Sequence, residues 1–363
     1  MSNHHKQKKI FNQGSDERFE DEKIIGGNPN GIINFNRSPY AWSYPLYKAM
    51  MARTWFPEQV NVSKDKVMYG QLTADEKRMY DLVLAQLITN DSIQTNQLMD
   101  RMNGYITESV VNACLCIQAK EEAVHSQSYA VMAEDIANDT DRIYMMHHYD
   151  DELRLKNQAV QDMYDSVFDI VLSEDETTVT YKKPTSEDLL MCFLANQILE
   201  EMVFPGGFAA MLSLEGKMPG TVEMIKEIMG DETLSHVPLF MNIFRTAVKE
   251  NFNGEIPESV KVRGKELIMK MCEAEKRWTK YATKGLLGFT DRTIDIFIQG
   301  KANSVCKNLG FDLYYPVEND NPLQKLLNKS LKGGEVESRT NFFEANSVEY
   351  TKGSFKENDD WEV

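Results

Sequence analysis

Residues 108–138 read ESVVNACLCIQAKEEAVHSQSYAVMAEDIAN, and apolar side chains recur in this stretch every three or four residues. That spacing is typical of an α-helix with one buried face. In the middle of the same face stand Gln118, Glu122, His125 and Tyr129, where further apolar side chains would be expected. Because a buried carboxylate without a partner costs several kcal/mol, packing alone does not explain this helix.

Three further segments, at about 73–103, 186–214 and 221–251, show the same helical spacing of apolar residues. Each of them also points ionisable side chains inward at about mid-length, namely Asp91, Glu200, Glu232 and His236. Four helices therefore direct acids and imidazoles toward one shared core.

The total charge of these side chains matches two divalent metal ions. Four carboxylates and two imidazoles share a core only if cations neutralise them. A carboxylate from each of two helices, with a Glu-x-x-His motif from each of two others, is the donor pattern of dimetal-carboxylate helical bundles. The sequence therefore predicts an all-α helical bundle with six metal ligands: Asp91, Glu122, His125, Glu200, Glu232 and His236.

One of the two Glu-His pairs departs from this pattern. Glu232 and His236 are four residues apart, whereas Glu122 and His125 are three apart. Helical residues four apart still share a face, and one extra residue can be absorbed as a π-helical turn, which is common at functional sites. We therefore predict a π-type turn between Glu232 and His236.

A second irregularity follows Glu200. The stretch Phe204-Pro205-Gly206-Gly207 places a proline and two glycines inside a predicted helix, and proline removes a helical hydrogen bond. We expect a kink or an unwound turn just after Glu200, which would allow this carboxylate to change its metal-binding mode. A simple helix bend is the alternative.

Composition argues against several other classes of protein. The 363 residues carry a net charge of −16, which disfavours binding to a nucleic-acid backbone because such binding needs basic patches. Apolar runs stay shorter than the roughly 20 residues of a membrane-spanning helix, so no membrane association is expected. The five cysteines lack the spacing of a disulfide framework or a zinc site, so reduced thiols and a cytoplasmic location are expected.

The chain divides by composition into three parts. Residues 1–40 lack periodicity and indicate a flexible N-terminal arm, residues 41–330 form the predicted helical domain, and residues 331–363 indicate a flexible C-terminal tail. Within the helical domain, residues 172–184 interrupt the helical spacing with β-branched side chains, which predicts a loop or a short hairpin.

The motifs around the six ligands resemble those of a known family, the small, radical-generating subunit of class I ribonucleotide reductase. The similar stretches within the bundle are Asp91-Ser-Ile-Gln94, Glu122-Ala-Val-His125-Ser-Gln-Ser-Tyr129, Leu199-Glu200 with Phe204, and Asp231-Glu232 with His236. Those outside it are Trp55-Phe-Pro-Glu58, Ala302-Asn303, Asn308-Leu-Gly310, Asn341-Phe-Phe-Glu344, Tyr350 and Asp359-Asp-Trp-Glu-Val363. The resemblance covers about residues 40–363.

The resemblance implies a ferritin-like helical bundle, a homodimer, and two metal ions held by the six ligands named above. In this family an oxidant reacts at the metals and a neighbouring tyrosine becomes a stable radical. Tyr129 is similar in position to that tyrosine, and Phe204 would pack beside it. Two iron ions are the first expectation, while two manganese ions or one of each remain open because the donor set suits both metals.

The same resemblance implies roles for further residues. Asp231 would orient a ligand histidine, His125, through a hydrogen bond. Trp55 and Tyr350 would carry the oxidising equivalent toward the large subunit, which holds the nucleotide site and reduces ribonucleotides to deoxyribonucleotides. The C-terminal tail, with Trp361 in its acidic end, would dock to that subunit and become ordered on binding. The need for an activating flavoprotein stays open.

Three other interpretations use the same scaffold. A stand-alone dimetal oxidase would need no docking tail, and a metal-storage bundle would need neither Tyr129 nor Trp55. A scaffold that has lost its metal would fit the unusual spacing of Glu232 and His236, but all six candidate ligands are present. The sequence therefore favours the radical-generating subunit of a ribonucleoside-diphosphate reductase.

Overall fold

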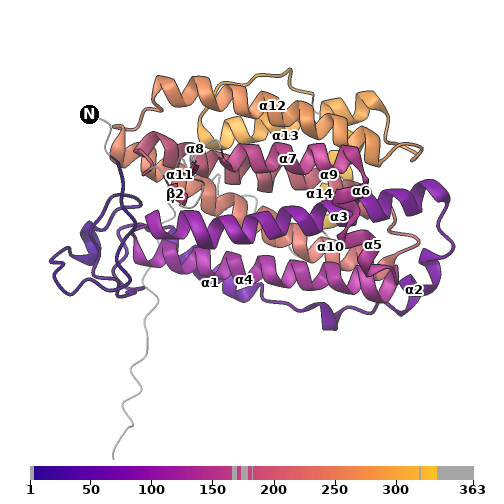
Figure 1. Cartoon of the computed structure of the whole chain (residues 1–363), viewed down its shortest axis with the longest axis horizontal. Coiled ribbons are helices and arrows are strands. Elements are labelled where there is room, and N and C mark those ends of the chain that lie inside the picture. Colours follow the sequence, from indigo (N-terminus) through magenta and orange to yellow (C-terminus); the bar gives the residue numbers. More distant parts are fainter. Residues whose placement is uncertain (1–3, 166–169, 173–178, 182, 319, 333–363) are drawn as a thin grey trace, which may run out of the picture.

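A computed structural model describes residues 4–165, 170–172, 179–181, 183–318 and 320–332. The long helices run along the longest axis of the molecule and pack into a bundle (Figure 1). The predicted all-α architecture is confirmed, with one short two-stranded hairpin added to it in the described part of the chain.

The two halves of the chain each contribute long and short helices. The first half contains α1 (Ser43–Ala52), α2 (Ser63–Tyr69), α3 (Ala74–Gln97), α4 (Ser109–Val131), α5 (Thr140–Tyr144), α6 (Met146–Tyr149) and α7 (Asp151–Asp165). The second half contains β1 (Ile170–Leu172), β2 (Val179–Tyr181), α8 (Ser186–Ile198), α9 (Phe204–Leu212), α10 (Pro219–Asp231), α11 (Val237–Asn251), α12 (Glu258–Ala282), α13 (Asp291–Leu309) and α14 (Pro322–Lys332). Short 3-10 helices lie at Phe19–Asp21, Pro57–Gln59 and Asn103–Tyr105.

Each of the four segments predicted to carry metal ligands contains a π-helical turn. These turns span Leu98–Met102 after α3, Met132–Ile136 after α4, Leu199–Val203 between α8 and α9, and Glu232–His236 between α10 and α11. The π-type turn predicted from the four-residue spacing of the second Glu-His pair is thus confirmed. An underwound turn also lies where a kink or unwound turn was expected around Glu200.

Local sequence signals set where the site helices begin. At the start of α3, Thr73 Oγ1 accepts a hydrogen bond from the backbone nitrogen of Glu76 at 3.3 Å, and the Thr73 nitrogen donates to Glu76 Oε2 at 2.9 Å. Glu108 caps α4 by accepting a hydrogen bond from the backbone nitrogen of Val111 at 2.6 Å. These caps satisfy backbone groups that a first helical turn leaves without partners, so both helices start at defined residues.

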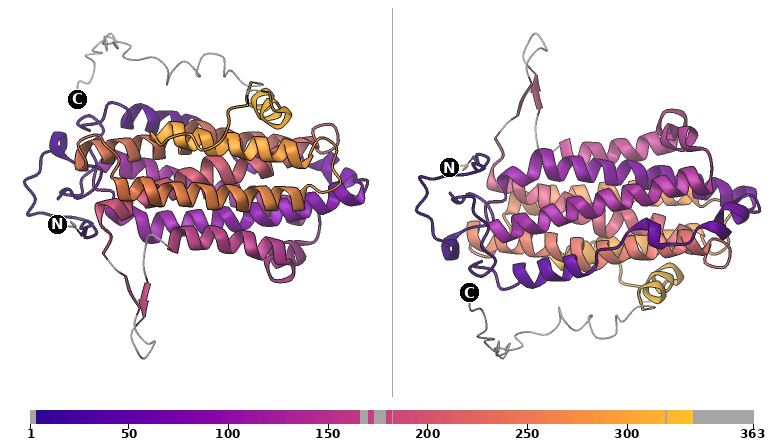
Figure 2. Two further views of the ribbon diagram at one scale, coloured as in Figure 1. Left: turned by 90° about the horizontal axis from the view of Figure 1, so that it is seen from above. Right: turned by 90° about the horizontal axis from the view of Figure 1, so that it is seen from below.

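Other segments lie at the ends and sides of the bundle. Strands β1 and β2 pair antiparallel with Val171 opposite Thr180, and they project from the bundle (Figure 2). A short hairpin is therefore present in the region where a loop or hairpin was predicted. Residues 4–42, most of which belong to the predicted arm, contain one 3-10 helix, and Ile24 and Ile25 in this stretch are buried. The predicted C-terminal tail lies outside the described residues from position 333 onward.

One helical stretch, Ser186–Leu212, is long and apolar enough by composition to span a membrane, which differs from the expectation that no apolar run reaches that length. Its apolar window is entirely buried inside the molecule. A helix that is apolar on all sides is typical of the centre of a large core. The apolar character of this stretch is accounted for by its position among the other helices of the bundle.

A buried ion pair fastens α7 to α12. Lys156 and Glu275 are 3% and 0% exposed, and their charged groups are in direct contact. Thr279 donates a further hydrogen bond from Oγ1 to Glu275 Oε1 at 3.0 Å. Gly206 of α9 lies against the same carboxylate, because a Cβ at this position would come within 2.7 Å of Glu275 Oε1. Glycine therefore permits the close approach of α9 to α12.

We predict that Lys156→Met and Glu275→Leu each lower the free energy of unfolding by about 3–5 kcal/mol, because each leaves a buried group without its charged partner. Urea unfolding followed by circular dichroism measures this change. Combining Lys156→Met with Glu275→Leu should recover most of the loss, and a double variant as unstable as the sum of the single ones would contradict the prediction. Arg154→Gln on the same helix breaks an exposed pair with Asp151 and should cost less than about 1 kcal/mol.

Candidate metal centre

The six predicted metal ligands lie together inside the bundle, and each is 0–2% exposed. They come from four segments: Asp91 from α3, Glu122 and His125 from α4, Glu200 from the π-turn after α8, and Glu232 and His236 from the π-turn after α10. The structure therefore brings together every ligand residue that the sequence singled out.

Their donor atoms form two adjacent groups, which we call position A and position B. Position A consists of Asp91, Glu122 and His125, and position B consists of Glu122, Glu200, Glu232 and His236. Within each group the ligand atoms lie within 4.8 Å of one another. One glutamate belongs to both groups, and the two imidazole rings have centroids 5.9 Å apart. The arrangement is that of two neighbouring cation positions with a shared carboxylate.

Two glutamates lie between the histidines. The Nδ1 atom of His125 is 3.5 Å from Glu122 Oε2 and 3.3 Å from Glu232 Oε1. The Nδ1 atom of His236 is 3.5 Å from Glu122 Oε1 and 2.7 Å from Glu232 Oε2. Each carboxylate thus turns one oxygen toward each histidine, so both glutamates could serve either cation position.

Many of the inward-facing donor atoms have no hydrogen-bond partner among the residues that the structure describes. These atoms are both carboxylate oxygens of Asp91, Oε2 of Glu122, Oε2 of Glu200, Oε1 of Glu232 and Nδ1 of His125. Buried polar atoms in folded proteins are almost always satisfied, so a cluster of this kind fits metal cations as the partners. The oxygen and nitrogen donors suit iron or manganese.

Burial and mutual repulsion govern the charges of this cluster. Burial raises the pKa of Glu122 to about 7 and also raises the pKa values of Asp91 and Glu232, and the Glu200 carboxylate adds to each shift. For Glu200 itself, burial is outweighed by contacts with its neighbours, which lower its pKa. Burial opposes the charged form of His125, but hydrogen bonds to carboxylates raise its pKa well above the ordinary value. Binding of metal ions would therefore displace protons from the cluster.

Asp231 connects His125 to Trp55. The Nε2 atom of His125 is 3.2 Å from Asp231 Oδ2, and Trp55 donates from Nε1 to the same oxygen at 2.8 Å. Arg53 donates to the other oxygen, Oδ1, at 3.1 Å. The predicted contact between Asp231 and His125 is thus present, and it leaves Nδ1 of His125 directed at the ligand cluster. Trp55 is 7% exposed and hydrogen-bonded as well as packed.

The partner of the second histidine was missed by sequence reasoning. The Nε2 atom of His236 is 2.9 Å from Oε2 of Glu121, which is 2% exposed. A signal was available in the sequence, because Glu121 directly precedes the ligand Glu122 just as Asp231 directly precedes the ligand Glu232.

Two glutamines hold one oxygen of Glu200. Gln94 and Gln118 each donate from Nε2 to Glu200 Oε1, at 2.5 Å and 2.8 Å. The other oxygen, Oε2, has no hydrogen-bond partner within the described ranges and lies 3.7 Å from Nδ1 of His236. The glutamines therefore orient Glu200 with a single oxygen toward position B.

Tyr129 is fully buried one helical turn beyond His125 on α4. Its hydroxyl has no hydrogen-bond partner among the residues with described positions. Burial, and then the carboxylates of Asp91 and Glu232, raise the pKa of Tyr129 well above its ordinary value. Phe204 is also fully buried, and its ring stacks on Phe208 with centroids 5.8 Å apart. Packing of Phe204 against Tyr129 stays a prediction.

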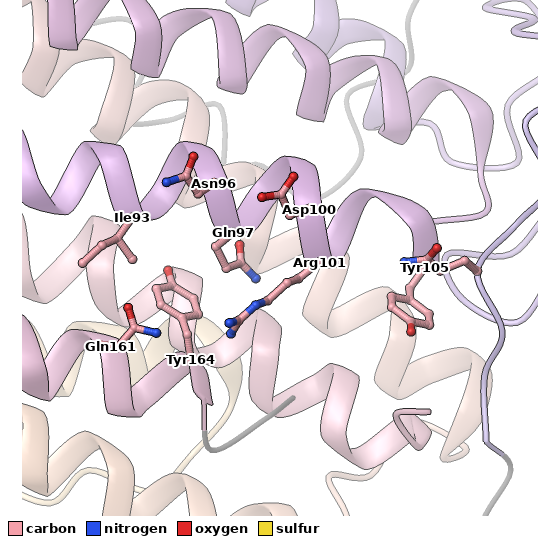
Figure 3. Close-up of a pocket in the computed structure, with 9 residues that line it drawn as sticks. Ile93, Asn96, Gln97, Asp100, Arg101, Tyr105, Gln161 and Tyr164 are labelled. Atoms are coloured by element: carbon pink, nitrogen blue, oxygen red, sulfur yellow. The ribbon is translucent and has the colours of Figure 1, made fainter. Parts of the chain in front are cut away.

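A second buried tyrosine reaches the centre from a pocket between α3 and α7. Tyr164 lines this cavity of about 420 Å³, and its hydroxyl points toward α3 (Figure 3). The hydroxyl donates to Gln94 Oε1 at 2.7 Å, and Gln94 in turn donates to the ligand Glu200. None of the six candidate ligands lines this pocket. Tyr164 is therefore linked to the centre through a neutral amide, whereas Tyr129 faces carboxylates.

Carboxylate and imidazole donors from four helices, in two groups that share a glutamate, define a dimetal-carboxylate protein. The chain belongs to the family of the ribonucleotide reductase small chain, whose model matches residues 32–322.

Individual relatives agree with this family over nearly the whole chain. The sequence is similar to the ribonucleoside-diphosphate reductase subunit beta of Treponema pallidum, with 31% identity over 350 residues that cover 95% of each chain. It is 30% identical to the subunit of the same name from Halalkalibacterium halodurans, over 91% of this chain and 92% of the relative. Among solved structures, the ribonucleotide reductase R2 subunit from Clostridium botulinum superposes with a TM-score of 0.80 at 27% identity, covering 90% of this chain and 99% of that chain.

Family membership confirms the function class predicted from the sequence. The chain is the small subunit of a ribonucleoside-diphosphate reductase, an oxidoreductase, and its helical bundle is of the ferritin-like kind. Small chains of this family work with a large subunit and are usually dimers. A stand-alone oxidase and a metal-storage bundle are correspondingly disfavoured.

We predict that divalent metal stabilises the folded chain, because cations relieve the repulsion among buried carboxylates and bind the folded state alone. At a free Mn²⁺ concentration 100 times the dissociation constant, one site contributes about 2.7 kcal/mol. Thermal unfolding of chelator-treated protein, with and without Mn²⁺, measures the shift in Tm. Glu232→Ala should abolish most of the shift, whereas Glu223→Ala, an exposed acid on α10, should keep it. Equal shifts in both variants would contradict the assignment.

Proposed function

We propose that this chain generates a tyrosyl radical on Tyr129, stores it, and passes the oxidising equivalent to the large subunit, where ribonucleotides are reduced to deoxyribonucleotides. One observation carries the proposal. A fully buried tyrosine, with a hydroxyl that no other described residue binds, lies one turn from His125 on the helix face that bears metal ligands.

The six ligand residues would hold two metal ions, one at position A and one at position B. Glu122 and Glu232 would help to hold both ions, because each turns an oxygen toward both histidines. We assign two iron ions first, and two manganese ions or one of each fit the same donors. When bound and oxidised by oxygen or a related oxidant, such a centre would accept one electron from a neighbouring side chain.

Formation of a neutral tyrosyl radical requires the phenol to lose a proton as well as an electron. Asp91 raises the pKa of Tyr129 more than any other charged residue does, so it is the base with the strongest influence on the hydroxyl. We assign Asp91 as the acceptor. Tyr164 lacks such an acceptor, because its hydroxyl donates to the amide of Gln94.

Burial protects the radical once it has formed. Tyr129 and Phe204 are both fully buried, and an enclosed apolar site keeps water and reductants away from a reactive intermediate. These residues would therefore set the lifetime of the radical, whereas the metal ligands would set how it is formed.

The hydrogen-bonded series His125, Asp231 and Trp55 offers a route from the centre toward the outside of the bundle. We assign Trp55 as a carrier of the oxidising equivalent and Asp231 as the residue that orients His125. Tyr350, the expected carrier in the tail, lies outside the described residues. Its place at the end of the route rests on the family resemblance.

The oligomeric state, the location and the protein partners of the chain follow from the same assignment. We propose that the chain acts as a homodimer in the cytoplasm and that its C-terminal tail docks to the large subunit. An activating flavoprotein is required if iron or manganese with oxygen alone gives no radical. Metal analysis joined to electron paramagnetic resonance of the protein as isolated identifies the metals.

We predict that Tyr129→Phe removes the tyrosyl signal from the electron paramagnetic resonance spectrum and leaves the metal content unchanged, because the phenol is lost while all six ligands remain. Tyr164→Phe is the matched control, since it removes the other buried phenol near the centre and should leave the signal in place. A tyrosyl signal that survives Tyr129→Phe, or that vanishes in Tyr164→Phe alone, would move the radical to another residue.

We also predict that deletion of residues 354–363 abolishes binding of the large subunit and leaves the tyrosyl signal intact, because the tail and the metal centre are separate parts of the chain. Analytical size-exclusion chromatography with the large subunit measures the first effect, and electron paramagnetic resonance measures the second. Loss of the radical in the truncated protein would contradict this division of labour.

A further inference from the structure

Among the described residues, His236 is the member of the metal centre that Glu121 contacts. It lies on α4, is 2% exposed, and places Oε2 at 2.9 Å from Nε2 of His236. The other ring nitrogen of His236, Nδ1, faces the carboxylates of position B. Glu121 therefore acts on the side of the imidazole that is turned away from the ligand atoms.

The two histidines have reciprocal partners. Glu121 comes from the helix of His125 but contacts His236, and Asp231 comes from the segment of His236 but contacts His125. Both acids directly precede a ligand glutamate in the sequence. Adjacent helical residues point in directions about 100° apart, so in each Glu-Glu or Asp-Glu pair one acid faces the cluster and its neighbour faces the partner helix.

The two acids differ in how many donors share their charge. Asp231 accepts hydrogen bonds from Trp55 and Arg53 in addition to its contact with His125. Glu121 contacts His236 through Oε2, and its Oε1 atom has no hydrogen-bond partner in the described part of the chain. A carboxylate whose charge is directed at a single N–H strengthens that imidazole as a metal ligand more than one whose charge is divided.

A buried carboxylate with so few partners is expensive to keep. The cost is offset if the imidazole that it contacts is bound to a cation on its other side. A cation at position B would therefore also stabilise the buried negative charge of Glu121.

We propose that Glu121 is a positioning residue that fixes His236 with Nδ1 toward position B and makes position B the stronger of the two metal positions. Its hydrogen bond selects the tautomer with the proton on Nε2 and leaves the Nδ1 lone pair for the metal ion. Because Glu122 and Glu232 each turn an oxygen toward both histidines, the difference between the two positions lies in the acid behind each imidazole, Glu121 for His236 and Asp231 for His125. The inference rests on the dimetal site of the proposed function.

The test is a titration of chelator-treated full-length protein with Mn²⁺, in which the free-ion electron paramagnetic resonance signal gives the two dissociation constants. Glu121→Gln keeps the shape of the side chain and removes its charge. We expect it to weaken the tighter step by about tenfold or more and to leave the weaker step within about twofold, since loss of such an outer partner typically costs 10–100-fold in affinity. Glu134→Gln, an exposed acid at the end of the same helix, is the matched control and should change neither step.

Asp231→Asn provides the converse experiment, because Asp231 contacts His125 of position A. This substitution should weaken the weaker of the two binding steps. Glu121→Ala, which also removes the hydrogen bond, should exceed Glu121→Gln in its effect, and Glu121→Asp should restore part of the affinity. Thermal unfolding of the apoprotein identifies any variant that fails to fold.

Equal weakening of both steps by Glu121→Gln would indicate a general structural role and overturn the inference, as would unchanged binding in Glu121→Ala. Wild-type protein that takes up no Mn²⁺ or Fe²⁺ would instead remove the proposed function, and this inference with it. If the wild type binds two ions and the Glu121 variants have unchanged dissociation constants, the inference is wrong and the proposed function is unaffected.

Discussion

The structure depends on one electrostatic constraint, the placement of four carboxylates and two imidazoles where water does not reach. In the folded chain these groups are almost completely buried, and many of their donor atoms have no other partner among the described residues. Such a core is stable only with cations or with bound protons. Burial raises the pKa values of Asp91, Glu122 and Glu232, which reflects the same constraint. Metal binding is therefore part of how this bundle satisfies its own interior.

The four π-helical turns show how the bundle adapts to that requirement. A regular α-helix directs residues three or four apart to one face, with little freedom to adjust their angle. The extra residue in the turn Glu232–His236 lets a pair spaced four apart meet the pair spaced three apart on α4. A similar turn holds Glu200, where Gln94 and Gln118 fix one of its oxygens. Two of the four turns thus hold ligands, whereas the turns Leu98–Met102 and Met132–Ile136 follow the ligand-bearing helices α3 and α4.

Much of the fold and of the metal centre could be predicted from the sequence, because acidic residues occupy positions where the helical spacing predicts apolar ones. The helical architecture, the six converging ligands, the π-turn at the second pair and the contact of Asp231 with His125 were all within reach. Contacts made by residues of a neighbouring helix could not be predicted in this way. Glu121 directly precedes Glu122 just as Asp231 precedes Glu232, but this position does not show which histidine the acid contacts. The motif that contains Gln94 does not show that its amide donates to Glu200 of another helix, and the burial of Ile24 within a polar segment depends on contacts distant in sequence. The length of the apolar helical stretch Ser186–Leu212 is not evident from uninterrupted apolar runs, because glutamates interrupt it.

The carboxylate of Asp231 serves two neighbours at once, since one of its oxygens is shared by the imidazole of His125 and the indole of Trp55. Under the roles proposed for His125 and Trp55, ion coordination and long-range charge transfer would meet at this single atom. Withdrawing the indole N–H would leave more of the negative charge for the imidazole, and the reduction potential of the nearer metal ion would change with it. Under the proposed roles, a substitution at Asp231 would therefore alter the metal ion and the charge transfer together.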